Sequence, residues 1–189
     1  MDKTTSVVRG GAPAVSRITL LVTITALLVV LTAGMAVAKN ITGTNGPDEL
    51  RGTTQADKIN GRGGADELRG LNGADELFGS DGKDQLFGGP GADTLKGGSG
   101  DDLLGGAEGG DTLRGGIGND ELEGRGGDDT LVAAGDGERD EVKCGDGTDV
   151  AEVDLNDVVD DQLVSSVIAL PGGVGSILSC ETVRVGLLE

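Results

Sequence analysis

The stretch GGPGADTLK at residues 88–96 is followed directly by GGSGDDLLG at residues 97–105. Both have glycine at the first and fourth positions, aspartate at the sixth and leucine at the eighth. The same nine-residue unit repeats ten times without an insertion from residue 43 to residue 132. The sixth position is always aspartate, as Asp48, Asp57, Asp66, Asp75, Asp84, Asp93, Asp102, Asp111, Asp120 and Asp129. An unbroken period of this length indicates a stack of identical structural units.

Each column of the repeat has a physical role. The glycines at positions one and four are expected to adopt positive φ, so that the first half of each unit forms a turn. The second half, such as Glu67-Leu68-Arg69, alternates polar, apolar and polar residues, which is typical of a short strand with one side chain facing a core. Two units then close one coil, and odd and even units form opposite walls. The sequence therefore predicts an all-β fold, a parallel β-roll (β-solenoid) with strands about 4.8 Å apart.

Three other classes of chain share parts of this composition. A glycine-rich acidic chain is often a flexible linker, but ten aspartates and ten aliphatic residues in fixed register disfavour disorder. Collagen requires glycine at every third residue, which this sequence lacks. Phosphate-binding loops require a Gly-Lys-Ser/Thr motif or a strand-turn-helix context, and neither is present.

The units GGPGADTLK at residues 88–96 and GGIGNDELE at residues 115–123 resemble the RTX, or haemolysin-type, calcium-binding nonapeptide repeat. The resemblance implies that the sixth-position aspartate supplies a carboxylate oxygen to Ca²⁺, together with turn carbonyls. Each ion is expected between two turns stacked on the same wall. The unit at residues 52–60 departs from the pattern because Gln55 replaces its fourth-position glycine.

Calcium suits irregular turns because it accepts six to eight oxygen ligands in loose geometry. Soft ligands arranged for zinc or copper are absent from the sequence. The implied metal ligands are the ten aspartates from Asp48 to Asp129. Five turns on each wall leave four gaps, so about eight ions is the expected upper limit.

The N-terminal segment has the features of a secretory signal. Lys3, Arg9 and Arg17 precede an uncharged stretch at residues 18–38, which ends in the small-residue site Ala36-Val37-Ala38. We expect cleavage after Ala38, with an uncleaved membrane anchor as the alternative, since the stretch is about long enough to span a bilayer. Either outcome places the remaining chain outside the cytoplasm.

Charge and residue inventory limit the function. Residues 39–189 carry 12 bases and 32 acids, a net charge of −20, which disfavours nucleic acid and anionic membranes and attracts cations. The sequence has no His, so a Ser-His-Asp triad, a Cys-His pair and a zinc-protease helix are excluded. Catalysis by two carboxylates remains open in principle. We expect no enzyme and no small-molecule substrate.

The period breaks at Ala133-Ala134, and two degenerate units follow at residues 135–152 with Asp140 and Asp149. We expect residues 133–189 to form a metal-free cap, because the terminal repeat of a solenoid is atypical. Cys144 and Cys180 are the only cysteines, and an exported chain favours a disulfide between them. That bond would attach a strand at residues 177–183 to the last coil. The segments CGDGTDV and SCETV resemble the ends of small secreted RTX proteins.

The expected organisation is a signal peptide at 1–38, a calcium-binding roll at 39–132 and a cap at 133–189. RTX arrays often accompany a protease, lipase or toxin domain, whereas this array begins close to the expected cleavage site. We therefore expect a stand-alone extracellular calcium-binding protein. A structural or adhesive role at the cell surface, with an unidentified partner, is the alternative. Stacked Thr94, Thr112 and Thr130 resemble an ice-binding face but are too few.

Overall fold

The fold was analysed in a computed structural model. It describes residues 37–160, 162–163, 180 and 182–186, and all statements below concern these residues. They contain strands and turns but no helix. The part of the chain that is described thus holds no helix with the length and hydrophobicity needed to cross a membrane. The expected signal segment at 1–38 lies almost wholly outside the described residues.

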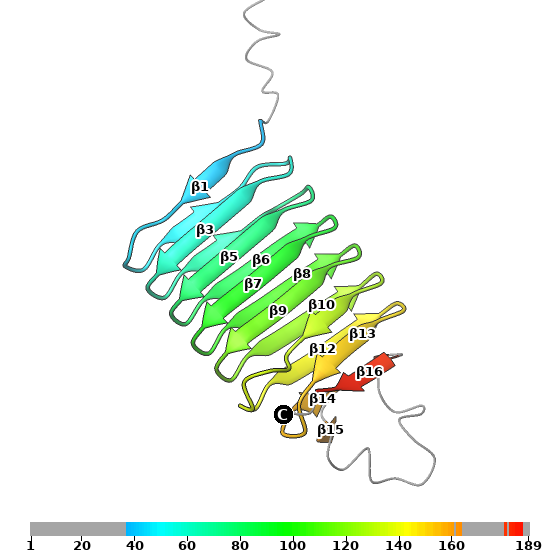
Figure 1. The fold of residues 1–189 in the computed structure, drawn as a ribbon. Helices are drawn as coiled ribbons and strands as arrows, with labels where there is room; N and C mark the ends of the chain where they lie inside the picture. Colours follow the sequence, from blue (N-terminus) through cyan, green and yellow to red (C-terminus); the bar gives the residue numbers. More distant parts are fainter. Residues whose placement is uncertain (1–36, 161, 164–179, 181, 187–189) are drawn as a thin grey trace, which may run out of the picture. The chain divides into compact units, whose positions relative to one another are not determined.

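Two parallel sheets of eight strands form the walls of a roll (Figure 1). The first sheet contains, in spatial order, β1 (Asn40–Thr42), β3 (Lys58–Gly63), β5 (Glu76–Asp81), β7 (Thr94–Ser99), β9 (Thr112–Ile117), β11 (Thr130–Val132), β13 (Val150–Val153) and β16 (Thr182–Val185). The second contains β2 (Glu49–Arg51), β4 (Glu67–Arg69), β6 (Gln85–Pro90), β8 (Leu103–Glu108), β10 (Glu121–Gly126), β12 (Glu141–Asp146), β14 (Val158–Val159) and β15 (Gln162–Leu163). Only the β14–β15 pair is antiparallel among the described pairs.

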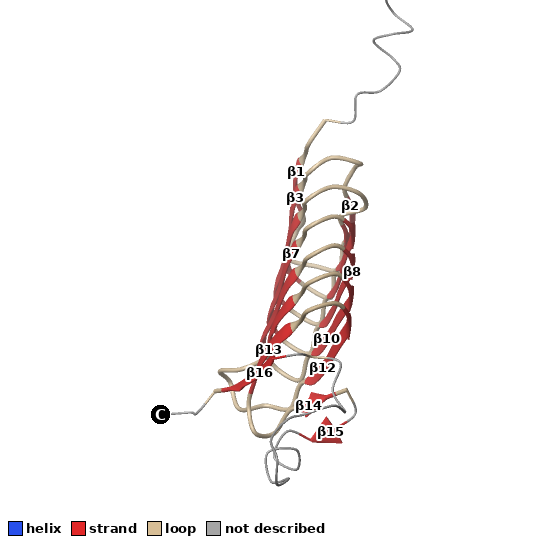
Figure 2. Cartoon of the chain, turned by 90° about the vertical axis from the view of Figure 1, so that its right-hand side faces the viewer, coloured by secondary structure: helices blue, strands red, loops and turns tan. Residues whose placement is uncertain are grey.

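The chain alternates between the two sheets, so that two repeat units make one coil (Figure 2). Residues eighteen apart are paired between neighbouring coils, as Leu77 is with Leu95. The expected parallel β-roll, with odd and even units on opposite walls, is confirmed.

The core is the aliphatic column at the eighth position of the repeat. Its members from the second unit onward have no exposed surface: Ile59, Leu68, Leu77, Leu86, Leu95, Leu104, Leu113, Leu122 and Leu131. Leu50 and Ile41 lie in the first coil and are only partly buried, because no coil covers them from above. Val142, Ala151 and Val159 continue the core beyond the regular repeats.

The first-position glycines differ from expectation. Eight of the sixteen described strands are six residues long, and those of the regular repeats run through the first three positions of the next unit, so Gly79, for example, lies within β5. Positive φ occurs instead at the second and fourth positions, as at Ser80 (87°) and Gly82 (139°). The prediction of positive φ at the first position was wrong. These glycines are required for space, because a Cβ there would overlap the aspartate of the same unit.

The C-terminal end is closed by the predicted disulfide. Cys144 lies in β12, Cys180 lies just before β16, and their Cα atoms are 5.2 Å apart. The expected strand at 177–183 falls largely outside the described residues, and the strand that is described there is β16. It pairs with β13 and extends the first sheet past the last repeat.

Candidate metal sites along the turns

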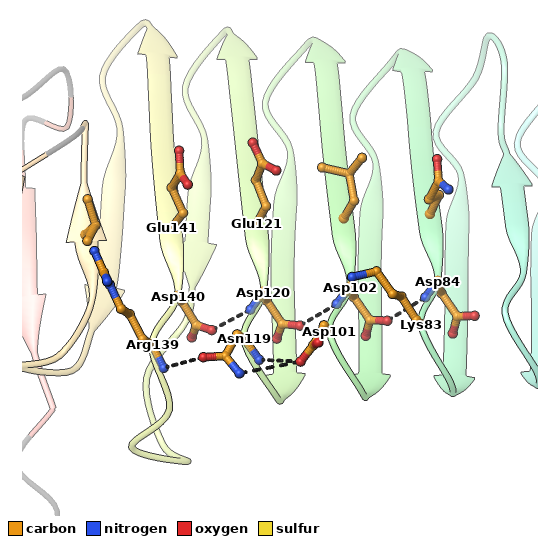
Figure 3. Close-up of a pocket in the computed structure, with 13 residues that line it drawn as sticks. Lys83, Asp84, Asp101, Asp102, Asn119, Asp120, Glu121, Arg139, Asp140 and Glu141 are labelled. Carbon is orange, nitrogen blue, oxygen red and sulfur yellow. Dashed lines mark hydrogen bonds between the residues drawn. The ribbon is translucent and has the colours of Figure 1, made fainter.

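The ten repeat aspartates lie in two rows, one along each edge of the roll where the chain passes between the sheets. The first row contains Asp48, Asp66, Asp84, Asp102 and Asp120, and the second contains Asp57, Asp75, Asp93, Asp111 and Asp129. Each of these aspartates directly precedes the first residue of a strand. All except Asp48 are buried, with at most 4% of their surface exposed. Figure 3 shows the middle of the first row.

One carboxylate oxygen of each buried aspartate connects neighbouring coils. The backbone N–H of Asp84 donates to Oδ1 of Asp102 at 2.8 Å, and the N–H of Asp102 donates to Oδ1 of Asp120 at 2.8 Å (Figure 3). The second row repeats this arrangement, as in the 2.8 Å bond from the N–H of Asp93 to Oδ1 of Asp111. The sixth-position aspartate therefore has a structural role that is separate from any role in metal binding.

The second oxygen, Oδ2, is buried and has no hydrogen-bond donor in eight of the ten repeat aspartates. These are Asp66, Asp75, Asp84, Asp93, Asp102, Asp111, Asp120 and Asp129. Burying a polar atom without a partner costs about 1–3 kcal/mol, and more for a charged group. Eight such atoms in register point to a missing positive partner rather than to isolated defects.

Each Oδ2 faces a space beside the first-position glycine of its unit, which we call the glycine cradle. A Cβ built on Gly79 would overlap Oδ2 of Asp84 and lie 2.7 Å from the carbonyl oxygen of Gly97 in the next coil. A Cβ on Gly97 would likewise meet Asp102 Oδ2 and Gly115 O. A carboxylate oxygen and a backbone carbonyl oxygen thus converge on one small space. Oxygen atoms of these two kinds are the ligands that calcium accepts.

Side chains alone do not build a metal centre here. The described part of the chain contains no cluster of three or more His, Cys, Asp or Glu side chains that would hold an ion. The cradles of Gly61, Gly70, Gly79, Gly97 and Gly124 instead pair one carboxylate oxygen with one main-chain carbonyl oxygen. That donor set fits calcium, which tolerates irregular geometry, and lacks the nitrogen and sulfur ligands typical of zinc.

Several of the buried repeat aspartates have a pKa well above the ordinary value. Burial, reinforced by neighbouring acids, raises the pKa of Asp93 and Asp102 to about 7. Burial, again with nearby acids, raises the pKa of Asp120 and Asp129 to about 6. Hydrogen bonds from backbone N–H groups oppose these shifts but do not cancel them. A cation beside these oxygens would favour the ionised carboxylates.

Asp48 and Asp57 in the first coil differ from the other eight. Oδ2 of Asp48 accepts bonds from the N–H and hydroxyl of Thr44, at 2.6 and 3.0 Å. Oδ2 of Asp57 accepts the N–H of Thr53, and its Oδ1 accepts the N–H of Lys39, each at 2.5 Å. Burial acts to raise the pKa of Asp57, but these hydrogen bonds outweigh it and leave the pKa below its ordinary value. Both predicted ligands already have donors.

The rows continue beyond the repeats. The N–H of Asp120 donates to Asp140 Oδ1 and that of Asp129 donates to Asp149 Oδ1, both at 2.8 Å. Oδ2 of Asp140 and of Asp149 is again buried without a donor. The first-position glycine is replaced in these turns, however. Cys144 takes this position in β12, since its neighbours Lys143 and Gly145 pair with Glu123 and Arg125 on either side of Gly124. Ala133 takes it after β11, since its N–H donates to Glu152 O in the next coil, as the N–H of Gly70 donates to Phe87 O.

The first row ends at Asp157, which sequence reasoning missed. Its Oδ1 accepts the N–H of Asp140 at 3.1 Å, and its Oδ2 accepts the N–H of Asp154 at 2.5 Å. Asp157 lies 17 residues after Asp140, and Asp140 lies 20 after Asp120. No period of nine or eighteen connects these residues, so the sequence offered no signal for the end of the row.

A shallow groove runs outside the first row (Figure 3). The residues that line it include Lys83, Asp101, Asn119 and Arg139, each of which directly precedes an aspartate of the row. Asn119 donates its N–H to Asp101 Oδ1 at 3.1 Å, and its Oδ1 accepts the N–H of Arg139 at 3.4 Å. These polar residues connect neighbouring turns.

Comparisons with known proteins agree with this geometry. The family model of the RTX calcium-binding nonapeptide repeat, in four copies, matches residues 42–77, 69–104, 78–113 and 105–137. These matches together span residues 42–137, which is more than half of the 189-residue chain. No curated protein matches the chain significantly. The periodic aspartates, the glycine cradles and the family match place this chain in the family of RTX calcium-binding nonapeptide repeat proteins.

Proposed function

We propose that this protein is an extracellular calcium-binding protein whose roll folds as calcium binds. The observation that carries the proposal is the set of eight buried Oδ2 atoms without hydrogen-bond donors, four in each row of aspartates from Asp66 to Asp129. Each is paired with a cradle that only a glycine leaves open. Bound calcium would supply positive charge to these oxygens and join the turns of neighbouring coils. About eight ions is the expected upper limit.

Electrostatics supports coupling between calcium and folding. Like charges stacked about 5 Å apart repel by roughly 1–3 kcal/mol per neighbour pair, and each row contains several such pairs. The core that opposes this repulsion is a single aliphatic column in each sheet. Each ion present at about tenfold over its Kd would add roughly 1.4 kcal/mol of stability. We therefore expect the calcium-free chain to be largely unfolded.

The expected compartment fits this linkage. Calcium-binding modules outside cells have affinities in the range of about 10⁻⁴ to 10⁻³ M. A chain exported by a signal at residues 1–38 would thus stay unfolded inside the cell, where calcium is scarce, and fold outside. The Cys144–Cys180 disulfide is of the kind that persists in oxidising compartments.

We also propose that the protein is not an enzyme and that its degenerate end turns hold no calcium. The cradles beside Asp140 and Asp149 carry the side chains of Ala133 and Cys144, where every regular turn has glycine. Burial, together with nearby acids, raises the pKa of Asp140 to about 8, against the opposing effect of a backbone hydrogen bond from Asp120.

Circular dichroism of the protein in chelator and during a calcium titration tests the proposed function. The β signal should be weak in chelator and should increase cooperatively with calcium. Magnesium is the matched control and should substitute poorly, because it demands tight octahedral geometry. A chelated sample already rich in β structure, unchanged by millimolar calcium, would refute the proposal.

A further inference from the structure

The second position of the repeat separates the first two turns from the other eight. In the turns of the third to tenth units this residue has positive φ. It is glycine in three of them, Gly89, Gly98 and Gly116, and another residue in five, Arg62, Leu71, Ser80, Ala107 and Arg125. The first two units have Thr44 and Thr53 there, and neither has positive φ.

The backbone direction at this position decides what the carboxylate meets. The N–H of Leu71 points to the next coil and donates to Gly88 O at 2.9 Å, which leaves Asp75 Oδ2 without a donor. The N–H of Thr53 instead donates to Oδ2 of Asp57 in its own turn. An N–H that is directed at this oxygen takes the place that a cation would need. Its partial positive charge also repels a cation.

The chemistry of threonine accounts for the difference. A β-branched residue is a clear outlier at positive φ, whereas Ser, Ala and Arg adopt it at a moderate cost. The threonine hydroxyls also stabilise the alternative turn. Gly46 N–H donates to Thr44 Oγ1 and Gln55 N–H donates to Thr53 Oγ1, both at 3.2 Å. Hydroxyls of Ser and Thr often form such local turns.

We propose that the residue after the first glycine determines whether a turn accepts calcium, and that Thr44 and Thr53 close the first two turns to it. This inference rests on the proposed calcium binding and names the turns that take part. Asp48 and Asp57 then act only as hydrogen-bond acceptors, and each is the first residue of its row of aspartates. The calcium-binding array begins at Asp66.

The first test lies in the middle of the stack, away from any effect of the chain end. Ser80 has positive φ in the turn of Asp84. Ser80→Thr should lower the number of bound ions by about one, measured by elemental analysis after equilibrium dialysis. Ser80→Ala is the matched control and should keep the full number, because Ala107 holds the same conformation at the same position.

The second test opens a closed turn. Thr44→Gly should add about one bound ion, since Gly46 already provides the flexible fourth position of that turn. Thr54→Gly, at the neighbouring third position of the next turn, should leave the number unchanged. The turn of Asp57 needs Thr53→Gly together with Gln55→Gly, because Gln55 replaces its fourth-position glycine.

The outcomes distinguish a failure of the proposed calcium binding from a failure of the proposed role of the second-position residue. If the unmodified protein binds no calcium, the proposed function fails. If it binds calcium and the number of ions is unchanged in Ser80→Thr or in Thr44→Gly, the inference is overturned. Position at the end of the stack, rather than threonine, would then explain the first two turns.

Discussion

Asp84 combines the two roles of the repeat aspartate in one side chain. It has no exposed surface, its Oδ1 accepts the N–H of Asp66 at 2.8 Å, and its Oδ2 faces the cradle of Gly79. Asp84→Asn preserves the shape and the Oδ1 acceptor but removes the charge. We expect fewer bound ions and a folding midpoint at clearly higher calcium concentration, measured by dichroism and elemental analysis.

Asp81 is the matched control for Asp84. It is an exposed acid at the third position of the same turn, and its side chain is outside the row. Asp81→Asn should therefore change both quantities little. Equal effects of the two variants would mean that these acids act only through overall charge.

Gly79 tests the cradle without changing any charge. Its backbone is not left-handed, so an alanine there adds only a methyl group, which would overlap Asp84 Oδ2. Gly79→Ala should lower the ion count and raise the calcium midpoint. Gly105→Ala is the control, because its Cβ would lie 3.4 Å from Phe87 Cδ1, an ordinary contact. A Gly79→Ala protein that binds and folds like the unmodified one would contradict the cradle.

Residue patterns anticipated the roll but not the reason for every glycine. The leucine column and the period of nine were sufficient to predict coils, walls and parallel strands, because both depend on spacing alone. A glycine, however, can be required either because its backbone has positive φ or because there is no space for a side chain. The sequence does not show which of these two reasons applies at a given position. Gly79 and Gly82 therefore looked alike in the sequence and differ in the structure.

At the level of elements, the rows of aspartates couple folding to pH. In the calcium-free roll Asp93 and Asp102 have pKa values of about 7, against an ordinary value of 3.8. Between roughly pH 4 and pH 7 the folded roll holds protons that the unfolded chain has released. Stability must then fall as pH rises through this window.

Low pH should accordingly stabilise the calcium-free roll, because protonation removes the repulsion between the aspartates. We expect more β signal in chelator at pH 5.5 than at pH 8, measured by circular dichroism. Calcium affinity should change in the opposite direction and increase with pH, because ligand carboxylates must lose their protons to bind. A calcium-free β signal that grows as pH rises would show that the rows are not protonated in this way.

The ends of the roll show where sequence reasoning stopped. The two extra residues near Ala133 and Gly135 shift the register, yet Asp140 and Asp149 still continue their rows through hydrogen bonds. The disulfide was predictable, since the chain has only two cysteines. The end of the first row at Asp157 was not, because it depends on how the last turn packs rather than on the repeat.

On the scale of the whole molecule, net charge links calcium binding to shape. Residues 39–189 carry a net charge of −20, and each bound calcium ion would neutralise two of these charges. Proteins near zero net charge associate more readily than strongly charged ones. The loaded roll is therefore better suited than the calcium-free chain to a structural or adhesive role, the alternative to simple calcium binding.

Small-angle X-ray scattering of the protein measures this change directly. An unfolded chain of about 150 residues has a radius of gyration of about 40 Å, and self-repulsion expands it further. Saturating calcium should reduce the radius to half or less, because binding both neutralises the rows and orders the coils. Sodium chloride at equal ionic strength is the control, since it screens charge without filling the cradles. If salt alone compacts the chain as far as calcium does, charge screening rather than binding in the turns drives folding.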